Sequence, residues 1–262
     1  IIGRVDTVSS IVLYRLMIKK IPVDFLDVFC RPVGQLCSDG EDFCSLCKAQ
    51  EYLITSSESL VYAKQLIRTK LHNCSEILRR RIDELAPVPN WHHFDQMMAL
   101  AENKNTLRGV EGLAARKYFD LWRGLFKNFS WSGRSKHPAT DEINSVLSFG
   151  YTLLRNRLTS ALRASGLNPR QGFYHMGRGR HSALSSDLME QFRPFVDTTV
   201  LSAVRRNILS SEDFCDSDFG RISFSPHGGF SKILGIFEAM FCEIKTVYSC
   251  NGNTTEKVVK SV

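Results

Sequence analysis

One short segment of the chain combines a histidine, two carboxylates and several arginines. It reads "GLNPRQGFYHMGRGRHSALSSDLMEQFRP", residues 166–194, with His175 in a glycine-containing stretch and Asp187 and Glu190 in the helix-like run that follows. Carboxylates three residues apart project from one face of a helix. They repel each other unless a cation, a proton or solvent intervenes. The pair is therefore either an ordinary solvated acidic face or part of a cation site.

His175 and Glu190 need a turn in the chain to meet. On one straight helix they would lie roughly 22 Å apart, at about 1.5 Å per residue. Gly177 and Gly179 stand between them, and Ser182 is a typical residue at the start of a helix. The chain is therefore able to turn back and bring His175 over the helix face. The alternative is a packed or surface histidine, which is the commoner fate of a single histidine.

A third candidate is Glu111 in "GVEGLAARKYF", which is flanked by Gly109 and Gly112 and followed by Ala114. Small residues let another helix or a backbone approach closely, so a glutamate presented there is able to reach across a helix interface. The alternative is an ordinary glutamate in the first turn of a helix, where the macrodipole favours a negative charge.

Together, Glu111, His175 and Glu190 would make a mixed oxygen and nitrogen site. Such a donor set suits Mn²⁺ and, with more water, Mg²⁺. These ions serve phosphodiester chemistry, because they polarise a phosphoryl oxygen and activate a hydroxyl nucleophile.

The charge balance fits a polyanionic partner such as nucleic acid. The 34 Lys and Arg residues outnumber the 27 Asp and Glu residues, which gives a net charge of +7. Candidate DNA-phosphate contacts are the basic residues near the segments above and one arginine run: Arg134, Lys136, Arg178, Arg180 and the arginines at 79–81. Each of them, taken singly, has a solvated surface position as its alternative.

The hydrophobic pattern predicts an α+β protein. Residues 1–36 read as short strands and one helix, and a polar stretch from Cys37 to Cys47 separates them from a long helical part. We expect a small, incomplete β-rich N-terminal domain with its linker over 1–44 and a larger all-α catalytic domain over 45–262. A long helix or helix pair is expected to begin near "PATDEIN" and stop at Gly166. Another helical pattern, over 186–209, is expected to be interrupted at Pro194.

The eight cysteines do not form a metal pattern of their own. Cys44 and Cys47 form a C-x-x-C, but a second pair with zinc-finger spacing is absent, so a structural zinc is disfavoured and the cysteines are interpreted as part of a linker.

No run of 18 apolar residues occurs, and this disfavours a membrane-spanning helix. The chain opens on "IIGRVDTVSS" without methionine, and we interpret it as a fragment or a domain of a longer polypeptide.

Several segments, in order, resemble one known family. They are "IPVDFLDVFCRPVGQL", "GVEGLAARKYFDLW", "HPATDEINSVLSFGYTLL", the segment 166–194 and "FVDTTV", and they span most of residues 20–200. The family is the CRISPR spacer-acquisition integrase, the first of the two universal CRISPR adaptation proteins. The stretch around His175 is the most specific part of the resemblance.

The resemblance implies a metal-dependent DNA endonuclease and integrase with an N-terminal β domain and a C-terminal all-α domain that holds the site. It places the family's metal ligands on Glu111, His175 and Glu190, with Mg²⁺ or Mn²⁺ as the ion. Asp187 matches a further acidic position of the same helix and is a supporting catalytic candidate. The reaction would join the 3′-hydroxyl ends of a short DNA fragment to the ends of a CRISPR repeat by transesterification.

The resemblance also implies partners. They are double-stranded DNA fragments and the repeat, a second copy of the chain bound through the N-terminal piece, and the second CRISPR adaptation protein, all in a prokaryotic cytoplasm without membrane association. Some family members carry a reverse transcriptase on their N-terminal side, and excision from such a fusion is one origin for this chain. Family members normally have several more N-terminal strands. Two alternatives stay open: a repair nuclease for branched DNA, and a DNA-binding scaffold without catalysis.

Overall fold

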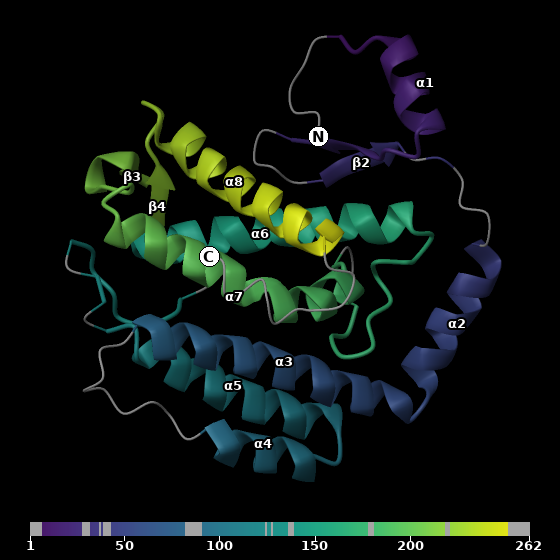
Figure 1. The fold of residues 1–262 in the computed structure, drawn as a ribbon, viewed down its shortest axis with the longest axis horizontal. Helices are drawn as coiled ribbons and strands as arrows, with labels where there is room; N and C mark the ends of the chain where they lie inside the picture. Colours follow the sequence, from purple (N-terminus) through teal and green to yellow (C-terminus); the bar gives the residue numbers. More distant parts are fainter. Residues whose placement is uncertain are drawn as a thin grey trace. The chain divides into compact units, whose positions relative to one another are not determined.

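The computed structural model describes residues 7–27, 32–36, 38, 43–81, 91–123, 125–126, 128–135, 139–177, 181–217 and 221–250. Helices make up most of this part of the chain, with two small antiparallel hairpins (Figure 1). This confirms the α+β class with a small β region near the N-terminus. The described helices are α1 (Ser10–Ile18), α2 (Phe43–Thr55), α3 (Glu58–Arg81), α4 (Trp91–Leu100), α5 (Lys104–Asp120), α6 (Glu142–Ala164), α7 (Ala183–Arg205) and α8 (Gly229–Cys250).

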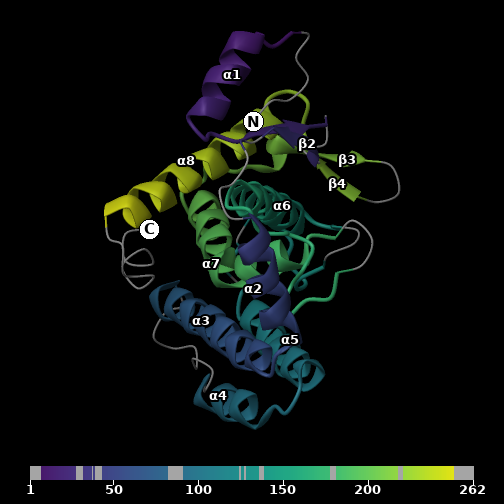
Figure 2. The same cartoon turned by 90° about the vertical axis from the view of Figure 1, so that its right-hand side faces the viewer.

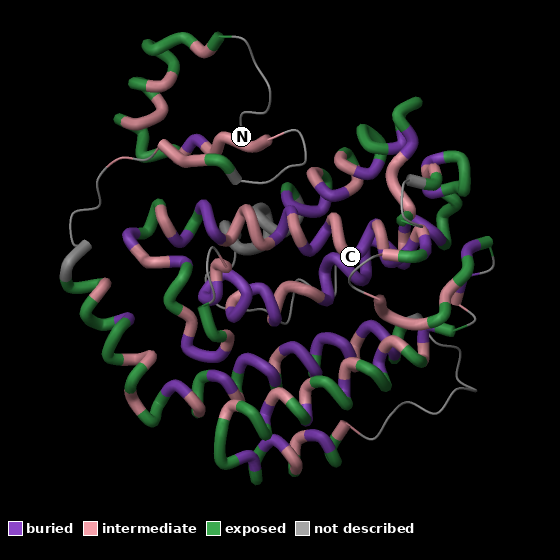
Figure 3. The backbone as a smooth tube through the Cα atoms, turned by 180° about the vertical axis from the view of Figure 1, so that it is seen from behind, coloured by how far each residue is buried: buried purple, intermediate pink, exposed green. Residues whose placement is uncertain are grey.

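The N-terminal piece consists of α1 and the hairpin of β1 (Val23–Leu26) and β2 (Pro32–Leu36). The strands pair antiparallel, with Val23 opposite Leu36 and an irregularity after Phe25. Helix α1 buries none of its residues and exposes large apolar side chains, which Figure 3 shows as a helix coloured only green and pink. Gln35 anchors the hairpin, because its Nε2 donates to the Ser160 hydroxyl at 2.7 Å.

Helix α6 ends where the sequence predicts and is a single helix of 23 residues rather than a pair. Gly166 has a positive φ of 77°, a conformation that glycine adopts without steric cost. Its N–H donates to the Arg163 carbonyl, and the N–H of Leu167 donates to the Leu162 carbonyl. These two bonds satisfy carbonyls of the last turn in the Schellman arrangement.

Helix α7 runs through Pro194, so the predicted interruption there is wrong. A proline inside a helix removes one backbone hydrogen bond and crowds the preceding turn. Burial compensates for this cost, because Phe195, Val196 and Val200 pack in the core immediately after it. Tertiary packing thus overrides a local helix-breaking signal.

Two elements of the C-terminal part lie outside the sequence predictions. Strands β3 (Phe214–Ser217) and β4 (Arg221–Phe224) form a second hairpin inside the region expected to be all-α, and α8 follows it (Figure 2). Asp213 ties these elements together. Its carbonyl accepts the Ser225 N–H, and its carboxylate accepts from Lys232 of α8 at 2.8 Å.

The chain divides into two compact units. The first contains residues 1–66 and 152–190, and the second contains residues 67–151 and 191–262. Helices α3, α6 and α7 each contribute residues to both units. The predicted domain boundary near residue 44 stays a prediction. In the described residues, no helix is both long and apolar enough to span a bilayer.

Candidate metal and DNA site

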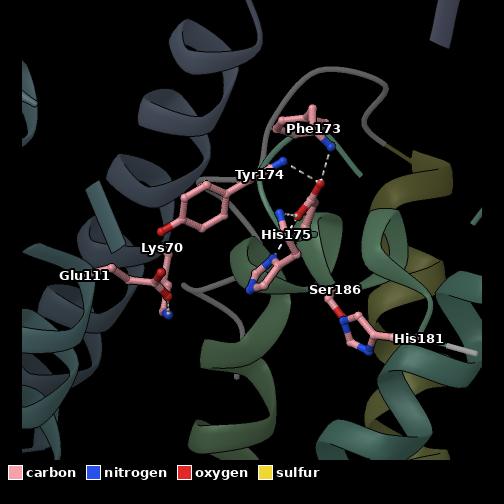
Figure 4. A network of polar contacts seen from close by, with 8 residues as sticks. Lys70, Glu111, Phe173, Tyr174, His175, His181 and Ser186 are labelled. Carbon is pink, nitrogen blue, oxygen red and sulfur yellow. Dashed lines mark hydrogen bonds and ion pairs between the residues drawn. The ribbon is translucent and has the colours of Figure 1, made fainter. Parts of the chain in front are cut away.

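Asp187 fixes the position of His175 through four hydrogen bonds (Figure 4). Its Oδ2 accepts the backbone N–H groups of Phe173 at 2.7 Å and Tyr174 at 3.0 Å. Its Oδ1 accepts the backbone N–H of His175 at 2.7 Å and lies 2.7 Å from the His175 Nδ1. We call this arrangement the Asp187 clamp. It folds the loop back over the start of α7, as the glycines of the sequence predict.

The clamp determines which ring nitrogen of His175 faces outward. An ionised carboxylate only accepts hydrogen bonds, so Nδ1 carries the proton in this pair, and in a neutral ring Nε2 has the lone pair. Metal-binding histidines in proteins commonly have such a carboxylate partner on the other nitrogen. The His175 side chain is 29% exposed while Asp187 is fully buried. His175 is thus the residue of the pair that is able to meet a ligand.

Gly172 makes the close approach of loop and helix feasible. A Cβ at this position would lie 2.7 Å from the Asp187 Oδ2 and 2.8 Å from the backbone carbon of Ala183. Both distances are shorter than real Cβ contacts, so any larger residue would displace the helix or the clamp. The glycine is therefore required by space at this point.

Glu190 lies one turn after Asp187 on α7 and is 2% exposed. The alternative of a solvated acidic face is therefore wrong for both carboxylates. Both carboxylate oxygens of Asp187 accept hydrogen bonds from the loop, so Asp187 positions His175. Glu190 is a buried carboxylate and belongs to the same compact unit as His175. Both properties are expected of a residue that would share a metal ion with His175.

Glu111 lies in the middle of α5, so a place in the first turn is wrong for it. The helix starts at Asn103, whose side chain accepts the backbone N–H groups of Asn105 and Thr106. Glu111 pairs with Lys70 of α3 at 2.5 Å, and the two side chains are only 15% and 9% exposed. The Lys70 ammonium balances the charge of a carboxylate that is largely removed from water.

The glycines beside Glu111 do not serve the predicted close approach. A Cβ built on Gly109 or Gly112 meets nothing within 4 Å, and both residues are exposed. Only Ala114 is fully buried, on the inner face of α5. Of the small residues around Glu111, Ala114 is therefore packed in the core, whereas Gly109 and Gly112 are exposed to solvent.

The three predicted metal ligands come from both compact units. His175 and Glu190 belong to the first unit and Glu111 to the second. Among the residues that the structure describes, no three His, Cys, Asp or Glu side chains form a group ready to hold a metal ion. The convergence of Glu111, His175 and Glu190 on one cation stays a prediction.

The sequence predicts four individual residues, besides the arginine run, as contacts to DNA phosphates. Of these four, the structure describes only Arg134. Its guanidinium donates to Asn144 Oδ1 at 2.7 Å and to the Ser148 hydroxyl at 3.0 Å, and Asn144 in turn is held by Asp141. Burial lowers the pKa of Arg134. This network links Arg134 to the start of α6, while its contact with DNA stays a prediction.

The remaining basic candidates divide into two sets. Lys136, Arg178 and Arg180 lie outside the described residues. In the arginine run, Arg79 and Arg80 are within salt-bridge distance of Glu76 on the same helix, at 2.8 and 3.8 Å. The cysteines at 30 and 37 also lie outside the described part.

Sequence reasoning missed a buried polar centre at Asp197. The hydroxyl of Tyr118 donates to Asp197 Oδ2 at 3.1 Å, and the hydroxyl of Tyr151 donates to Oδ1. Burial raises the pKa of Asp197 to about 6, although the tyrosine hydrogen bonds and the charges of Arg193 and Arg134 oppose the rise. The signal in the sequence was a lone aspartate between apolar and β-branched residues in "FVDTTV".

Comparison with known sequences identifies relatives over most of the chain. The family model described as "CRISPR associated protein Cas1" matches residues 1–230. A "CRISPR-associated endonuclease Cas1 1" from Thermus thermophilus is 38% identical over 160 residues, which are 59% of this chain and 49% of that protein. A "CRISPR-associated exonuclease Cas4/endonuclease Cas1 fusion" from Geobacter sulfurreducens is 31% identical over 231 residues, 82% of this chain and 41% of the fusion. The chain spans about half the length, or less, of these relatives.

Comparison with solved structures confirms the fold. A CAS1 protein from Thermotoga maritima matches with a TM-score of 0.74 at 23% identity, over 90% of this chain and 76% of that one. A "Partial Cas6-RT-Cas1--Cas2 complex" matches with a TM-score of 0.74 at 24% identity, over 88% of this chain and 73% of the matched chain. A "Casposase bound to integration product" has a TM-score of 0.71 at 24% identity, over 88% and 70% of the two chains.

Proposed function

The chain belongs to the CRISPR-associated Cas1 family, and from this premise we propose that it is a divalent-metal-dependent DNA endonuclease and integrase. It would insert short DNA fragments at the ends of CRISPR repeats by transesterification. The observation that carries the proposal is the Asp187 clamp, which holds Nδ1 of His175 at 2.7 Å from a buried carboxylate oxygen. A histidine with one nitrogen committed in this way is preorganised to bind a metal with the other.

Glu111, His175 and Glu190 would hold the cation, which we propose to be Mg²⁺ or Mn²⁺. Two carboxylates and a neutral imidazole suit these ions. When bound, such an ion polarises the phosphodiester and favours ionisation of an attacking 3′-hydroxyl. His175 would contribute Nε2, because Asp187 occupies Nδ1. Lys70 would hold the Glu111 carboxylate in place through the 2.5 Å ion pair.

Partners of the proposed function follow from the relatives and from the surface of the N-terminal piece. We propose DNA and the second adaptation protein, Cas2, as partners, since solved neighbours are described as an integration product complex and as complexes with Cas2. We also propose a homodimer through the N-terminal piece. Ile11, Tyr14 and Ile18 of α1 and Val33 of β2 are all more than 60% exposed, and apolar surface of this kind is typical of an interface.

The decisive experiment is a strand-transfer assay. The purified protein is incubated with a fluorescent double-stranded fragment and a repeat-containing plasmid, with and without Cas2, in Mg²⁺, Mn²⁺ or EDTA. We expect a joined product that requires metal and is lost in His175→Ala, while gel-shift affinity for the fragment stays largely unchanged, since one neutral imidazole adds little to phosphate neutralisation. His227→Ala is the matched control, because His227 is exposed and lies in the other unit.

The same assay separates the alternatives. Cleavage of branched DNA without joining would support the repair nuclease. Strand transfer by His175→Ala at the parental rate would overturn the assignment of the metal site. DNA binding without metal-dependent cleavage or joining would favour the scaffold.

A further inference from the structure

The loop that carries His175 is held at its start by a glutamine of α2. Gln50 Nε2 donates to the carbonyl of Asn168 at 2.7 Å and to the carbonyl of Gln171 at 2.8 Å. Gln50 Oε1 accepts the backbone N–H of Asn168 at 3.0 Å. A side-chain amide has two N–H donors and one carbonyl, so the loop engages both donors and the acceptor. All of these residues belong to the same compact unit as His175.

Gln50 is buried, which is uncommon for a glutamine. It is 7% exposed, and among the side chains of α2 that the structure describes, residues 45–55, it is the one buried residue. Burying an amide is unfavourable unless its hydrogen bonds to water are replaced, and the loop replaces them. The contact between α2 and the loop therefore depends at this point on directed hydrogen bonds, which specify the position of the backbone.

The first part of the loop forms a tight turn on this anchor. The Asn168 carbonyl also accepts the N–H of Gln171 at 3.2 Å, and Asn168 Oδ1 accepts the N–H of Arg170 at 3.0 Å. The Pro169 carbonyl accepts the N–H of Leu184 in α7 at 2.9 Å. Residues 168–171 are therefore tied both to α2 and to α7.

One residue separates the Gln50 anchor from the Asp187 clamp. The Gln171 carbonyl accepts from Gln50, whereas the N–H of Phe173 donates to the clamp. Gly172 lies between them. Consecutive Cα atoms are about 3.8 Å apart, so this link is too short to absorb a shift of the turn. A displacement of the turn therefore reaches the clamp and the histidine that it holds.

We propose that Gln50 is a positioning residue for strand transfer: it fixes the start of the loop, so that the Asp187 clamp presents Nε2 of His175 to the cation. The inference rests on the proposed function and deepens it, since it adds a residue of α2 to the requirements of the same reaction. Gln50 acts in this role through the backbone of the loop, without contact to the cation or the DNA. A misplacement of about 1 Å caused by a change far from the chemistry is able to lower a rate about 100-fold.

The test compares Gln50 variants in strand transfer, metal binding and stability. Gln50→Met keeps the length of the side chain and removes its hydrogen bonds. Gln96→Glu is the control, because Gln96 is exposed on α4 in the other unit. Values of kcat and of KM for the fragment, the Mn²⁺ affinity and the ¹⁵N signals of the His175 ring are measured at a temperature at which circular dichroism shows every variant to be folded.

For Gln50→Met we expect kcat and Mn²⁺ affinity to fall about 10–100-fold, the range for residues that orient a metal ligand. KM for the fragment stays at the parental value, because DNA affinity depends mainly on basic side chains. The ¹⁵N signals of the His175 ring shift. Gln96→Glu leaves all of these quantities at their parental values.

Gln50→Glu adds a rescue by pH. At pH 8 its carboxylate would face two carbonyl oxygens, so its kcat is as low as that of Gln50→Met. Burial raises the pKa of a carboxylic acid, and the protonated acid again donates one hydrogen bond to the loop. The kcat of Gln50→Glu, divided by that of the wild type at each pH, therefore rises toward pH 6, whereas the same ratio for Gln50→Met stays constant.

The failures are distinguishable. Wild-type protein without metal-dependent strand transfer overturns the proposed function and this inference together. An active wild type with Gln50→Met at the parental kcat overturns this inference alone. A purely structural role would lower the melting temperature of Gln50→Met and leave kcat and the His175 signals of the folded protein unchanged, which also contradicts the inference. If Gln50→Met does not fold, Gln50→Glu decides, because a kcat ratio that does not rise toward pH 6 contradicts the inference as well.

Discussion

Asp187→Asn tests the clamp most sharply, because it keeps the shape of the side chain and removes its charge and one acceptor oxygen. In the wild type, each carboxylate oxygen accepts two hydrogen bonds. Whichever way the new amide turns, its NH₂ group faces two former donors. If it faces Phe173 and Tyr174, two hydrogen bonds are lost. If it faces His175, the ring is able to respond only by moving its proton from Nδ1 to Nε2.

The magnitude follows from these contacts. Hydrogen bonds to a charged group contribute about 1.5–3 kcal/mol each, so the loss of two should lower the free energy of unfolding by about 3–6 kcal/mol. A proton on Nε2 removes the lone pair that a metal needs. Losing the partner that orients a metal-binding histidine typically costs about 10–100-fold in metal affinity. We therefore expect weaker Mn²⁺ binding beyond what lower stability explains.

Three measurements check this prediction. Denaturant unfolding gives the stability, calorimetric titration gives the Mn²⁺ affinity of the folded protein, and ¹⁵N NMR of the histidine rings reports the position of the proton. Asp216→Asn in β3 is the control, because Asp216 is exposed, and it should change stability by less than about 0.5 kcal/mol. Asp187→Asn protein with parental Mn²⁺ affinity and the proton still on Nδ1 would refute the reasoning.

Three further predictions follow from single positions. Gly172→Ala should destabilise the protein by more than about 2 kcal/mol in thermal or denaturant unfolding, since its Cβ meets backbone at 2.8 Å, whereas Gly112→Ala, in open space on α5, should stabilise it by about 0.5–1 kcal/mol. Lys70→Met should cost about 3 kcal/mol by leaving the Glu111 carboxylate buried without its ammonium, and a Lys70→Met/Glu111→Gln double variant should recover part of that cost. Because the pKa of Asp197 is raised from 3.8 to about 6, the native state binds this proton more tightly than the unfolded chain. Stability should therefore fall by about 3 kcal/mol from this group as the pH rises from about 4 to 6, and stability curves of Asp197→Asn should lack that part of the decline.

The sequence predicted the elements that depend on local chemistry. Gly166 ends α6 because the left-handed conformation there suits glycine. Gly177 lets the loop approach its own backbone, because a Cβ there would lie 2.7 Å from the Arg170 carbonyl oxygen. Pro194 shows the limit of this reasoning, because its local cost is outweighed by the burial of Phe195 and Val196, and burial depends on residues remote in the chain.

The candidate site shows the same division. The residue types and spacing of Asp187 and Glu190 predicted that both lie on one helix face, with a solvated face and a cation site as alternatives, but not that Asp187 would be used internally. That distinction depends on three backbone N–H groups of the loop, and backbone groups leave no trace in a pattern of side chains. The ion pair of Lys70 with Glu111 was equally hidden, because it joins two helices whose packing the sequence does not specify.

The Asp187 clamp also gives the protein a built-in reporter of its own assembly. The amide protons of Phe173, Tyr174 and His175 point to a carboxylate that is in place only when α7 has formed. Their hydrogen-exchange rates should therefore follow the opening of α7 and not the motion of the loop in which they lie.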